Sequence, residues 1–229
     1  MFNQPVTSGP QGGQSSDQQQ LLRLNVDFLK LLISMDPTTA SSGVAQQLSL
    51  RSEQACNLGL CQEADLQRMA ACGFSLFSLS LHRADLWQRA AAHSQPMSHA
   101  QHYGNQPTGA PIDEFERICA GFMECALFFA WHLAQQQPHQ ARLLLGMSED
   151  CMAIVTHLDL WQCRQIAQTQ LKLLSLRWRH HPYFWADLLR YGQSGDQQHF
   201  KFAQLLGSQL MAQELEPSAL LRLSSTDLD

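Results

Sequence analysis

Residues 145–176 read LGMSEDCMAIVTHLDLWQCRQIAQTQLKLLSL, and residues 48–79 read LSLRSEQACNLGLCQEADLQRMAACGFSLFSL. Displaced by 97 residues, the two stretches align without a gap. Identical residues are few, but the apolar positions agree in phase, and a tryptophan follows each stretch at a similar distance, Trp87 and Trp185. The match predicts an internal repeat of one small structural unit. The clearest matched positions are Leu48 with Leu145, Glu53 with Asp150, Met69 with Ile166, Ala70 with Ala167, Phe77 with Leu174, and Leu79 with Leu176.

An apolar helix precedes each copy. Its side chains recur every three or four residues, the spacing of one helix face. In both copies a proline follows the stripe, at Asp36-Pro37 and at Gln137-Pro138, and the residue before a proline disfavours the α region. The stripe residues are Leu21, Leu24, Phe28, Leu31 and Leu32 in the first copy, and Ile118, Phe122, Cys125, Phe129 and Leu133 in the second.

Shorter helices are expected within each copy, at 44–59 with a break near Ser49 to Ser52, at 63–72 and at 84–92. Alternation of apolar residues with serine in 74–81 predicts a short strand. In the second copy Ser148 can cap a helix, and Asp159 with Gln162 fits a capping box. The predicted fold is all-α, with two tandem pseudo-symmetric helical modules and one short β-strand in each.

The predicted boundaries follow composition. Residues 1–19 are rich in Gln, Ser, Gly and Pro and are expected to form a disordered tail. Residues 20–92 form the first module, 93–111 a Pro/Gly/His-rich linker, and 112–191 the second module. A C-terminal helix over about 197–214 and a loose end occupy 192–229.

The charge is low for a folded protein. Only 15% of the residues are charged, the net charge is −5, and the lysines are Lys30, Lys172 and Lys201. Proteins that grip nucleic acid unaided usually carry a broad basic face, so we expect any DNA contact here to be local. A weakly charged surface favours association, and a homo- or hetero-oligomer is expected.

The chain is expected to be cytoplasmic. Its cysteines number seven, an odd count without a CxxC pair, which fits reduced buried thiols better than disulfides. The first residues, MFNQPVTSGP, lack the basic and apolar regions of a signal peptide. Apolar stretches are shorter than a membrane span, so no membrane insertion is expected.

The second copy resembles a known family. The stretch from ALFFAWHL at 126–133 through Leu145-Gly146-Met147 to LKLLSLRW at 171–178 is similar to FlhD, the helical subunit of the bacterial flagellar master transcription regulator. The first copy is similar more weakly, through LNVDFLKLL and SLFSLSLH. Such proteins are helical dimers that join a zinc-binding subunit, FlhC, bind promoter DNA and recruit RNA polymerase. Two copies in one chain imply an internal pseudo-dimer.

One local basic cluster is a candidate DNA- or partner-binding site. If 173–179 is extended, Arg177 and Arg179 share a face and Trp178 lies opposite. The guanidinium groups could then reach phosphate while Trp178 anchors the segment. The alternative is a solvated basic rim beside a core tryptophan. The residues concerned are Lys172, Arg177, Trp178, Arg179 and His180, followed by His181.

A second candidate is a helix-turn-helix formed by 148–157 and 160–169. Its second helix would offer Arg164 and several glutamines, such as Gln162, to bases in the major groove. The alternative is two packed core helices. Trp161 lies early on this helix, where an exposed tryptophan would mark a partner contact.

Catalytic and metal-site signatures are missing. His99 and His102 could chelate a metal, but no cysteine or carboxylate lies at ligand spacing. There is no nucleophile motif, phosphate loop or HExxH, so no enzyme activity, catalytic residue, metal or cofactor is expected. The sequence thus predicts either a transcriptional regulatory subunit with an FlhC-like partner, or a scaffold subunit of a cytosolic secretion or motility apparatus without a DNA role.

Overall fold

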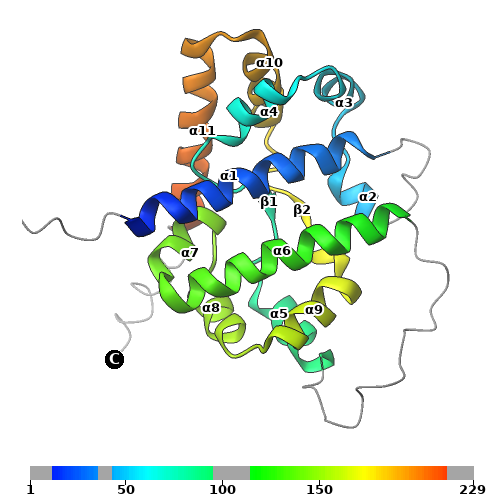
Figure 1. Ribbon diagram of the computed structural model, residues 1–229, viewed down its shortest axis with the longest axis vertical. Coiled ribbons are helices and arrows are strands. Elements are labelled where there is room, and N and C mark those ends of the chain that lie inside the picture. The colour runs from blue at the N-terminus through cyan, green and yellow to red at the C-terminus, as the bar shows by residue number, and fades with distance from the viewer. Residues whose placement is uncertain (1–11, 36–42, 95–113, 216–229) are drawn as a thin grey trace, which may run out of the picture.

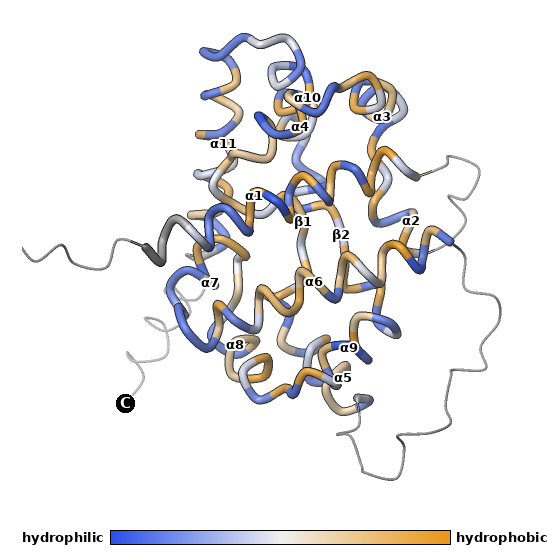
Figure 2. The backbone as a smooth tube through the Cα atoms, viewed as in Figure 1, coloured by the Kyte–Doolittle hydropathy of each residue, from blue (hydrophilic) through white to orange (hydrophobic). Residues whose placement is uncertain are grey.

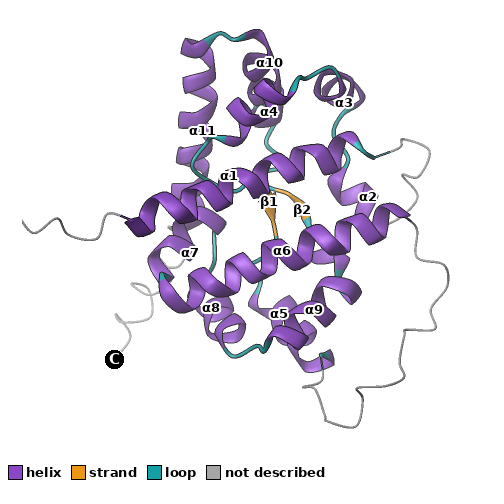
Figure 3. Cartoon of the chain, viewed as in Figure 1, coloured by secondary structure: helices purple, strands orange, loops and turns teal. Residues whose placement is uncertain are grey.

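The computed structural model describes residues 12–35, 43–94 and 114–215. Over these ranges the chain forms eleven α-helices, one 3-10 helix and a sheet of two short strands (Figure 3), which confirms the predicted all-α fold. The helices are α1 (Gly12–Ile33), α2 (Gly43–Leu48), α3 (Ser52–Gly59), α4 (Glu63–Ala70), α5 (Ala84–His93), α6 (Glu114–Gln136), α7 (Pro138–Leu145), α8 (Glu149–Thr156), α9 (Leu160–Thr169), α10 (Phe184–Ser194) and α11 (Gln197–Leu215). The 3-10 helix η3 is Leu171–Leu173, and the strands are β1 (Phe77–Ser78) and β2 (Ser175–Leu176).

The first helix begins earlier than the sequence predicted. Residues 12–19 are helical rather than part of a tail, and Asp17 is buried, with its carboxylate accepting a hydrogen bond from Gln137 Nε2. This contact joins residues far apart in the chain, which is why composition alone did not indicate it. The rest of the predicted tail, residues 1–11, and most of the predicted linker, residues 95–111, lie outside the described residues.

The two longest helices, α1 and α6, cross one face of the molecule side by side (Figure 1). They run in opposite directions, because Asp17 of α1 contacts Gln137 after α6, while Ser34 after α1 shares a surface hollow with Ile118 near the start of α6. Their buried faces meet at Phe28 and Phe122, whose ring centroids lie 5.4 Å apart.

The two strands pair at the centre of the molecule, where each contributes two residues. They are antiparallel, with Phe77 opposite Leu176 and Ser78 opposite Ser175. Phe77 points into the core and meets Phe122 of α6 edge to face at 5.2 Å. The predicted strands are therefore present but much shorter than the alternating stretches of sequence.

Each strand is followed by a tryptophan that makes the same kind of hydrogen bond. Trp87 Nε1 donates to the carbonyl of Leu79 at 3.1 Å, and Trp185 Nε1 donates to the carbonyl of Arg177 at 2.8 Å. In each case the acceptor lies eight residues before the tryptophan. A buried indole N–H needs an acceptor, and both tryptophans take it from the turn that follows their own strand.

The turn after each strand also has the same backbone shape. Ser80 and Trp178 are the non-glycine residues with positive φ in the described part of the chain, at 53° and 51°. Arg83 N then donates to Ser80 O, and His181 N donates to Trp178 O, both at 2.9 Å. A left-handed non-glycine residue is uncommon, so its recurrence before α5 and α10 indicates a shared local structure.

Helix starts match as well. Asp159 and Gln162 form the predicted capping box of α9, with Gln162 N donating to Asp159 Oδ1 at 2.7 Å. At the start of α4, Gln62 N donates to Asp65 Oδ2 at 3.0 Å. Ser148 caps α8 as predicted, accepting from Cys151 N at 3.2 Å.

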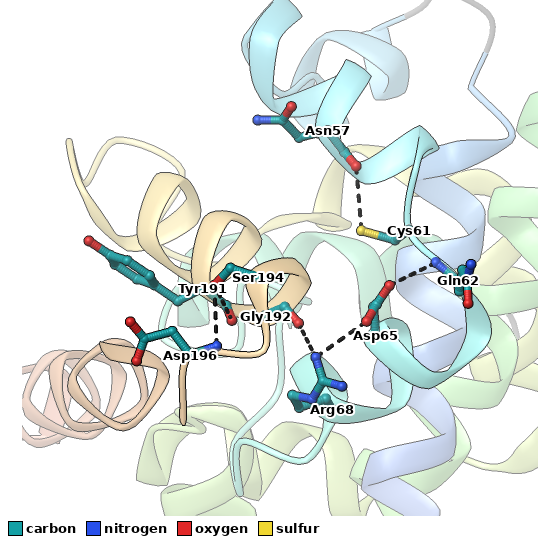
Figure 4. A network of polar contacts seen from close by, with 9 residues as sticks. All are labelled: Asn57, Cys61, Gln62, Asp65, Arg68, Tyr191, Gly192, Ser194 and Asp196. Carbon is teal, nitrogen blue, oxygen red and sulfur yellow. Dashed lines mark hydrogen bonds and ion pairs between the residues drawn. The ribbon is translucent and has the colours of Figure 1, made fainter. Parts of the chain in front are cut away.

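The helices that follow the strands pack on the opposite half of the chain. α5 lies against α8 and α9, and α10 lies against α3 and α4. Figure 4 shows part of the second contact, where Arg68 of α4 donates to the carbonyl of Gly192 of α10 and pairs with Asp65. Met69 of α4 packs so closely on α10 that a Cβ at Gly192 would lie 2.2 Å from Met69 Cγ.

This exchange gives one hydrophobic core. Figure 2 shows hydrophobic and hydrophilic residues interspersed along the helices. The buried apolar residues form a single cluster drawn from both halves. Its largest fully buried side chains include Phe28, Phe74, Phe77, Trp87 and Phe184. The helix α6 is apolar and long enough to cross a membrane by composition, but half of its most apolar window is buried within this core.

Candidate nucleic-acid interface

The predicted basic cluster is divided by a sharp turn. β2 ends at Leu176, and the left-handed conformation of Trp178 breaks the alternation expected over 173–179. Arg177 is only 2% exposed, whereas Arg179 is exposed. The expectation that Arg177 and Arg179 share one outward face is therefore wrong, and Arg177 cannot present its guanidinium group to an external phosphate.

Arg177 instead joins four parts of the fold. Its guanidinium group donates to Ser75 Oγ at 3.0 Å, to Leu144 O at 2.9 Å and to the Glu214 carboxylate at 2.7 Å. It also lies over the ring of Trp178, 4.6 Å from the centroid. A buried cation needs such pairing and hydrogen bonding, so these contacts make Arg177 a structural residue.

Trp178 and Lys172 also differ from one another in role. Trp178 is half-buried and packs edge to face on Phe74 at 5.1 Å and on Phe184 at 4.8 Å. Lys172 lies exposed on η3. The tryptophan therefore anchors the turn, while the lysine remains a solvated cation on the surface.

The exposed part of the basic cluster opens onto a hollow of about 360 Å³, which we call the basic hollow. It lies between the segment that joins α2 to α3 and the turn that joins β2 to α10, and the buried Trp185 contributes to its wall. Its lining residues are Ser49, Leu50, Arg51, Gln54, Leu176, Arg179, His180, His181 and Trp185.

Two arginines of the basic hollow have no carboxylate partner within the part of the chain that the structure describes. Over the described residues, neither Arg51 nor Arg179 has a carboxylate within ion-pair distance, and both are exposed. Glu53 lies close by in sequence, in the first turn of α3, but does not line the hollow. A planar guanidinium group without a carboxylate partner is well suited to bind a phosphate through two parallel hydrogen bonds.

Neutral donors complete the lining. His181 Nδ1 accepts from the backbone N–H of Phe184 at 3.1 Å, so the neutral ring carries its proton on Nε2. Gln54 Oε1 accepts from Arg51 N at 3.1 Å, which leaves the Gln54 amide N–H₂ as a donor. The hollow is therefore rich in donors and poor in acceptors, the composition expected of an anion site.

Arg51 was not among the residues singled out from the sequence. It is an isolated arginine in its own stretch and lies far along the chain from Arg179. Only the packing of α3 against α10 brings the two arginines to one hollow. Of the predicted cluster, Arg179 and His180 belong to this site, and Arg177 does not line it.

The predicted helix-turn-helix is occupied by internal contacts. Gln162 N and its amide take part in the α9 cap, and Gln162 Nε2 donates to Ser94 O at 3.2 Å. Arg164 pairs with Glu124 of α6 at 3.7 Å. α9 packs on α6, and α5 packs on both α8 and α9, so the arrangement favours packed core helices over a base-reading helix.

Trp161 and Arg164 instead line an apolar groove between α6 and α9. The groove has a volume of about 690 Å³. Leu160 at its edge is 56% exposed, and Trp161 and Phe128 are half-buried. The groove is lined by Glu124, Phe128, Asp159, Leu160, Trp161 and Arg164.

Three of the buried cysteines are poorly suited to nucleophilic chemistry. Burial raises the pKa of Cys72 to about 12, that of Cys163 to about 12 and that of Cys151 to about 11. Such thiols stay protonated at neutral pH and are poor nucleophiles. No group of three or more His, Cys, Asp or Glu side chains able to hold a metal ion occurs in the described part of the chain, and His99 and His102 lie outside it.

Comparison with known proteins adds no relative: no protein-family model, curated protein or solved structure matches this chain. The similarity to FlhD thus stays a prediction from the sequence, and function has to be argued from the basic hollow and the apolar groove.

Proposed function

We propose that this chain is a non-enzymatic regulatory subunit of transcription, resembling FlhD, that contacts the phosphates of DNA through the basic hollow as part of a larger complex. The unpaired Arg51 and Arg179 at one solvent-facing hollow are the observation that carries the proposal. Sequence-independent phosphate contacts position regulators on a duplex, and they do not require a base-reading helix.

The charge of the chain explains why a companion is part of the proposal. With a net charge of −5 and two unpaired arginines at the hollow, the chain alone can neutralise few phosphates. Affinity for DNA rises steeply with the number of phosphates neutralised, so unaided binding is expected to be weak. A more basic subunit, such as an FlhC-like protein, would supply the remaining contacts.

The test measures binding of a labelled DNA duplex over a series of salt concentrations, with the chain alone and with the subunits that co-purify from its native cell. The double variant Arg51→Gln/Arg179→Gln is expected to bind at least tenfold more weakly at low salt. The slope of log affinity against log salt should fall by about two, because two phosphate contacts are lost.

The control removes the same charge elsewhere. Arg83→Gln/Arg89→Gln alters two exposed arginines that pair with Asp85 and lie outside the hollow. This variant should retain wild-type DNA binding. Absence of salt-dependent binding in both the chain and its native complex would overturn the proposal.

A scaffold subunit of a cytosolic secretion or motility apparatus is the second candidate, and the apolar groove favours it. Leu160 exposes more than half of its surface at a groove that also contains Trp161 and Phe128, and an apolar side chain of a partner would cover these residues together. A photo-crosslinking residue at Leu160, followed by mass spectrometry, separates the candidates. Crosslinks to RNA polymerase or a zinc-binding subunit support the regulator, and crosslinks to a membrane-complex component support the scaffold.

A further inference from the structure

The basic hollow has a structural counterpart at the other end of the molecule. By their matching tryptophan contacts and left-handed turns, Ser80 corresponds to Trp178 and Trp87 corresponds to Trp185. Each of these pairs is separated by 98 residues, and the same separation makes Leu81 the counterpart of Arg179. The cap positions of α3 and α8, displaced by 97 residues, relate Arg51 to Ser148.

The counterpart end has no arginine at either of the two corresponding positions. Where the hollow has Arg51, the counterpart has Ser148, whose hydroxyl is used to cap α8. Where the hollow has Arg179, the counterpart has Leu81, which is buried. The pair of exposed arginines is therefore confined to one of the two ends.

The cations that remain at the counterpart end are already paired. Arg83 donates to Asp85 through Nε at 2.9 Å and Nη2 at 3.0 Å, and Arg89 donates to the same carboxylate at 2.9 Å. Arg142 pairs with Glu149 at 3.0 Å. An anion there would compete with fixed carboxylates, whereas an anion in the basic hollow would not.

We propose that the basic hollow is a phosphate-binding site, present once per chain, in which Arg51 and Arg179 hold the phosphate oxygens and the Gln54 amide and His181 Nε2 donate further hydrogen bonds. The source is either a phosphate of a nucleic-acid backbone or a free phosphate, since both present the same oxygens. The backbone source rests on the proposed function, whereas the site itself does not.

The site fits the chemistry of phosphate in three respects. The two guanidinium groups come from different segments, the residue that precedes α3 and the turn before α10, so they can approach one phosphate from two sides. The N-terminal end of α3, which starts directly after Arg51, adds the positive end of a helix dipole. Among the described residues that line the hollow, none carries a carboxylate.

The experiment titrates inorganic phosphate into the full-length chain labelled with ¹⁵N-arginine and follows the guanidinium signals by NMR, with calorimetry for stoichiometry. We expect saturable shifts at Arg51 and Arg179, none at Arg83 and Arg89, and one phosphate per chain. Arg51→Gln and Arg179→Gln should each weaken phosphate binding about tenfold, since a charge-assisted hydrogen bond is lost. Arg83→Gln should leave it unchanged.

Folding is checked by thermal unfolding, which these exposed and unpaired arginines should not affect. Two equivalents bound per chain, shifts shared with Arg83 and Arg89, or binding insensitive to both substitutions would overturn the site. A parallel titration with a DNA duplex separates the sources. Phosphate binding that both substitutions weaken, together with DNA binding by the native complex that neither substitution weakens, assigns the site to a free phosphate and overturns the DNA contact proposed above. Weakening of both by the same substitutions assigns the site to the nucleic-acid backbone.

Discussion

At the scale of single residues, two neighbouring arginines show how position decides role. Arg177 and Arg179 are separated by one tryptophan, and the left-handed turn at Trp178 sends one inward and the other to solvent. The buried Arg177 has three kinds of acceptor, a hydroxyl, a carbonyl and the carboxylate of Glu214. The exposed Arg179 has none of these among the described residues, which is the basis for the proposed anion site.

This contrast predicts that the same substitution costs much more stability at Arg177 than at Arg179. Arg177→Gln is expected to lower the free energy of unfolding by about 3 kcal/mol, because it breaks a buried ion pair and strands its acceptors. Arg179→Gln should change stability by less than about 0.5 kcal/mol, as is usual for an exposed side chain without partners. Urea unfolding monitored by circular dichroism measures both, and equal effects would contradict the assignment of Arg177 as structural.

At the scale of helices, the packing of α10 on α4 depends on a glycine, which has no side chain. Gly192 brings its backbone against Met69, and a Cβ there would lie 2.2 Å from Met69 Cγ. Gly121 on α6 is the natural comparison, because a Cβ at that position meets nothing within 4 Å. Both glycines are helical, so the difference lies in their surroundings.

Alanine at these two glycines should therefore act in opposite directions. Gly192→Ala is expected to destabilise the protein by about 1–3 kcal/mol, the usual cost of overpacking a core contact. Gly121→Ala should stabilise it by up to about 1 kcal/mol, since alanine favours helix more than glycine does. Thermal unfolding of the two variants provides the measurement, and a stabilising Gly192→Ala would mean that α10 is not held tightly on α4.

The sequence predicted where helices begin better than it predicted how long the strands are. Helix starts at Ser148 and Asp159 follow from local capping chemistry, and both were found. The strands proved only two residues long, because the turn at Ser80 and Trp178 depends on tryptophan contacts that local patterns do not encode.

The candidate site shows the same limit. Arg179 and His180 could be predicted from a visible basic cluster, but Arg51 could not, because its place at the hollow comes from packing between segments distant in sequence. An extended strand that continued past Leu176 would place Arg177 at the surface, but the left-handed turn at Trp178 ends the strand. Tertiary contacts, rather than residue type, separated these arginines.

At the scale of the whole molecule, each half supplies a helix to the other. α5 packs on α8 and α9, and α10 packs on α3 and α4, so each half, if separated, would lose the helix with which the other half covers it. The buried cluster spans both halves. The two halves therefore form one unit of folding, although the sequence pattern describes them as two modules.

Separating the halves provides the corresponding test. Chains covering 1–94 and 95–229 should each be largely unfolded alone, because the apolar faces exchanged between α5 and α9 and between α10 and α4 would be exposed. Mixed or co-expressed, they should assemble into a one-to-one complex with the helical content of the intact chain. Circular dichroism and analytical ultracentrifugation would show this, and a stably folded single half would contradict it.

The matching turns at Ser80 and Trp178 have a consequence for how such a protein can change over time. In a symmetric homodimer every mutation is expressed at both ends, so one end cannot gain a cation without the other gaining it too. Here the related ends are encoded separately in one polypeptide, and Arg179 at one end corresponds to Leu81 at the other. Because both halves lie in one chain, the two ends of the molecule can differ in sequence, which the two ends of a symmetric assembly of identical subunits cannot.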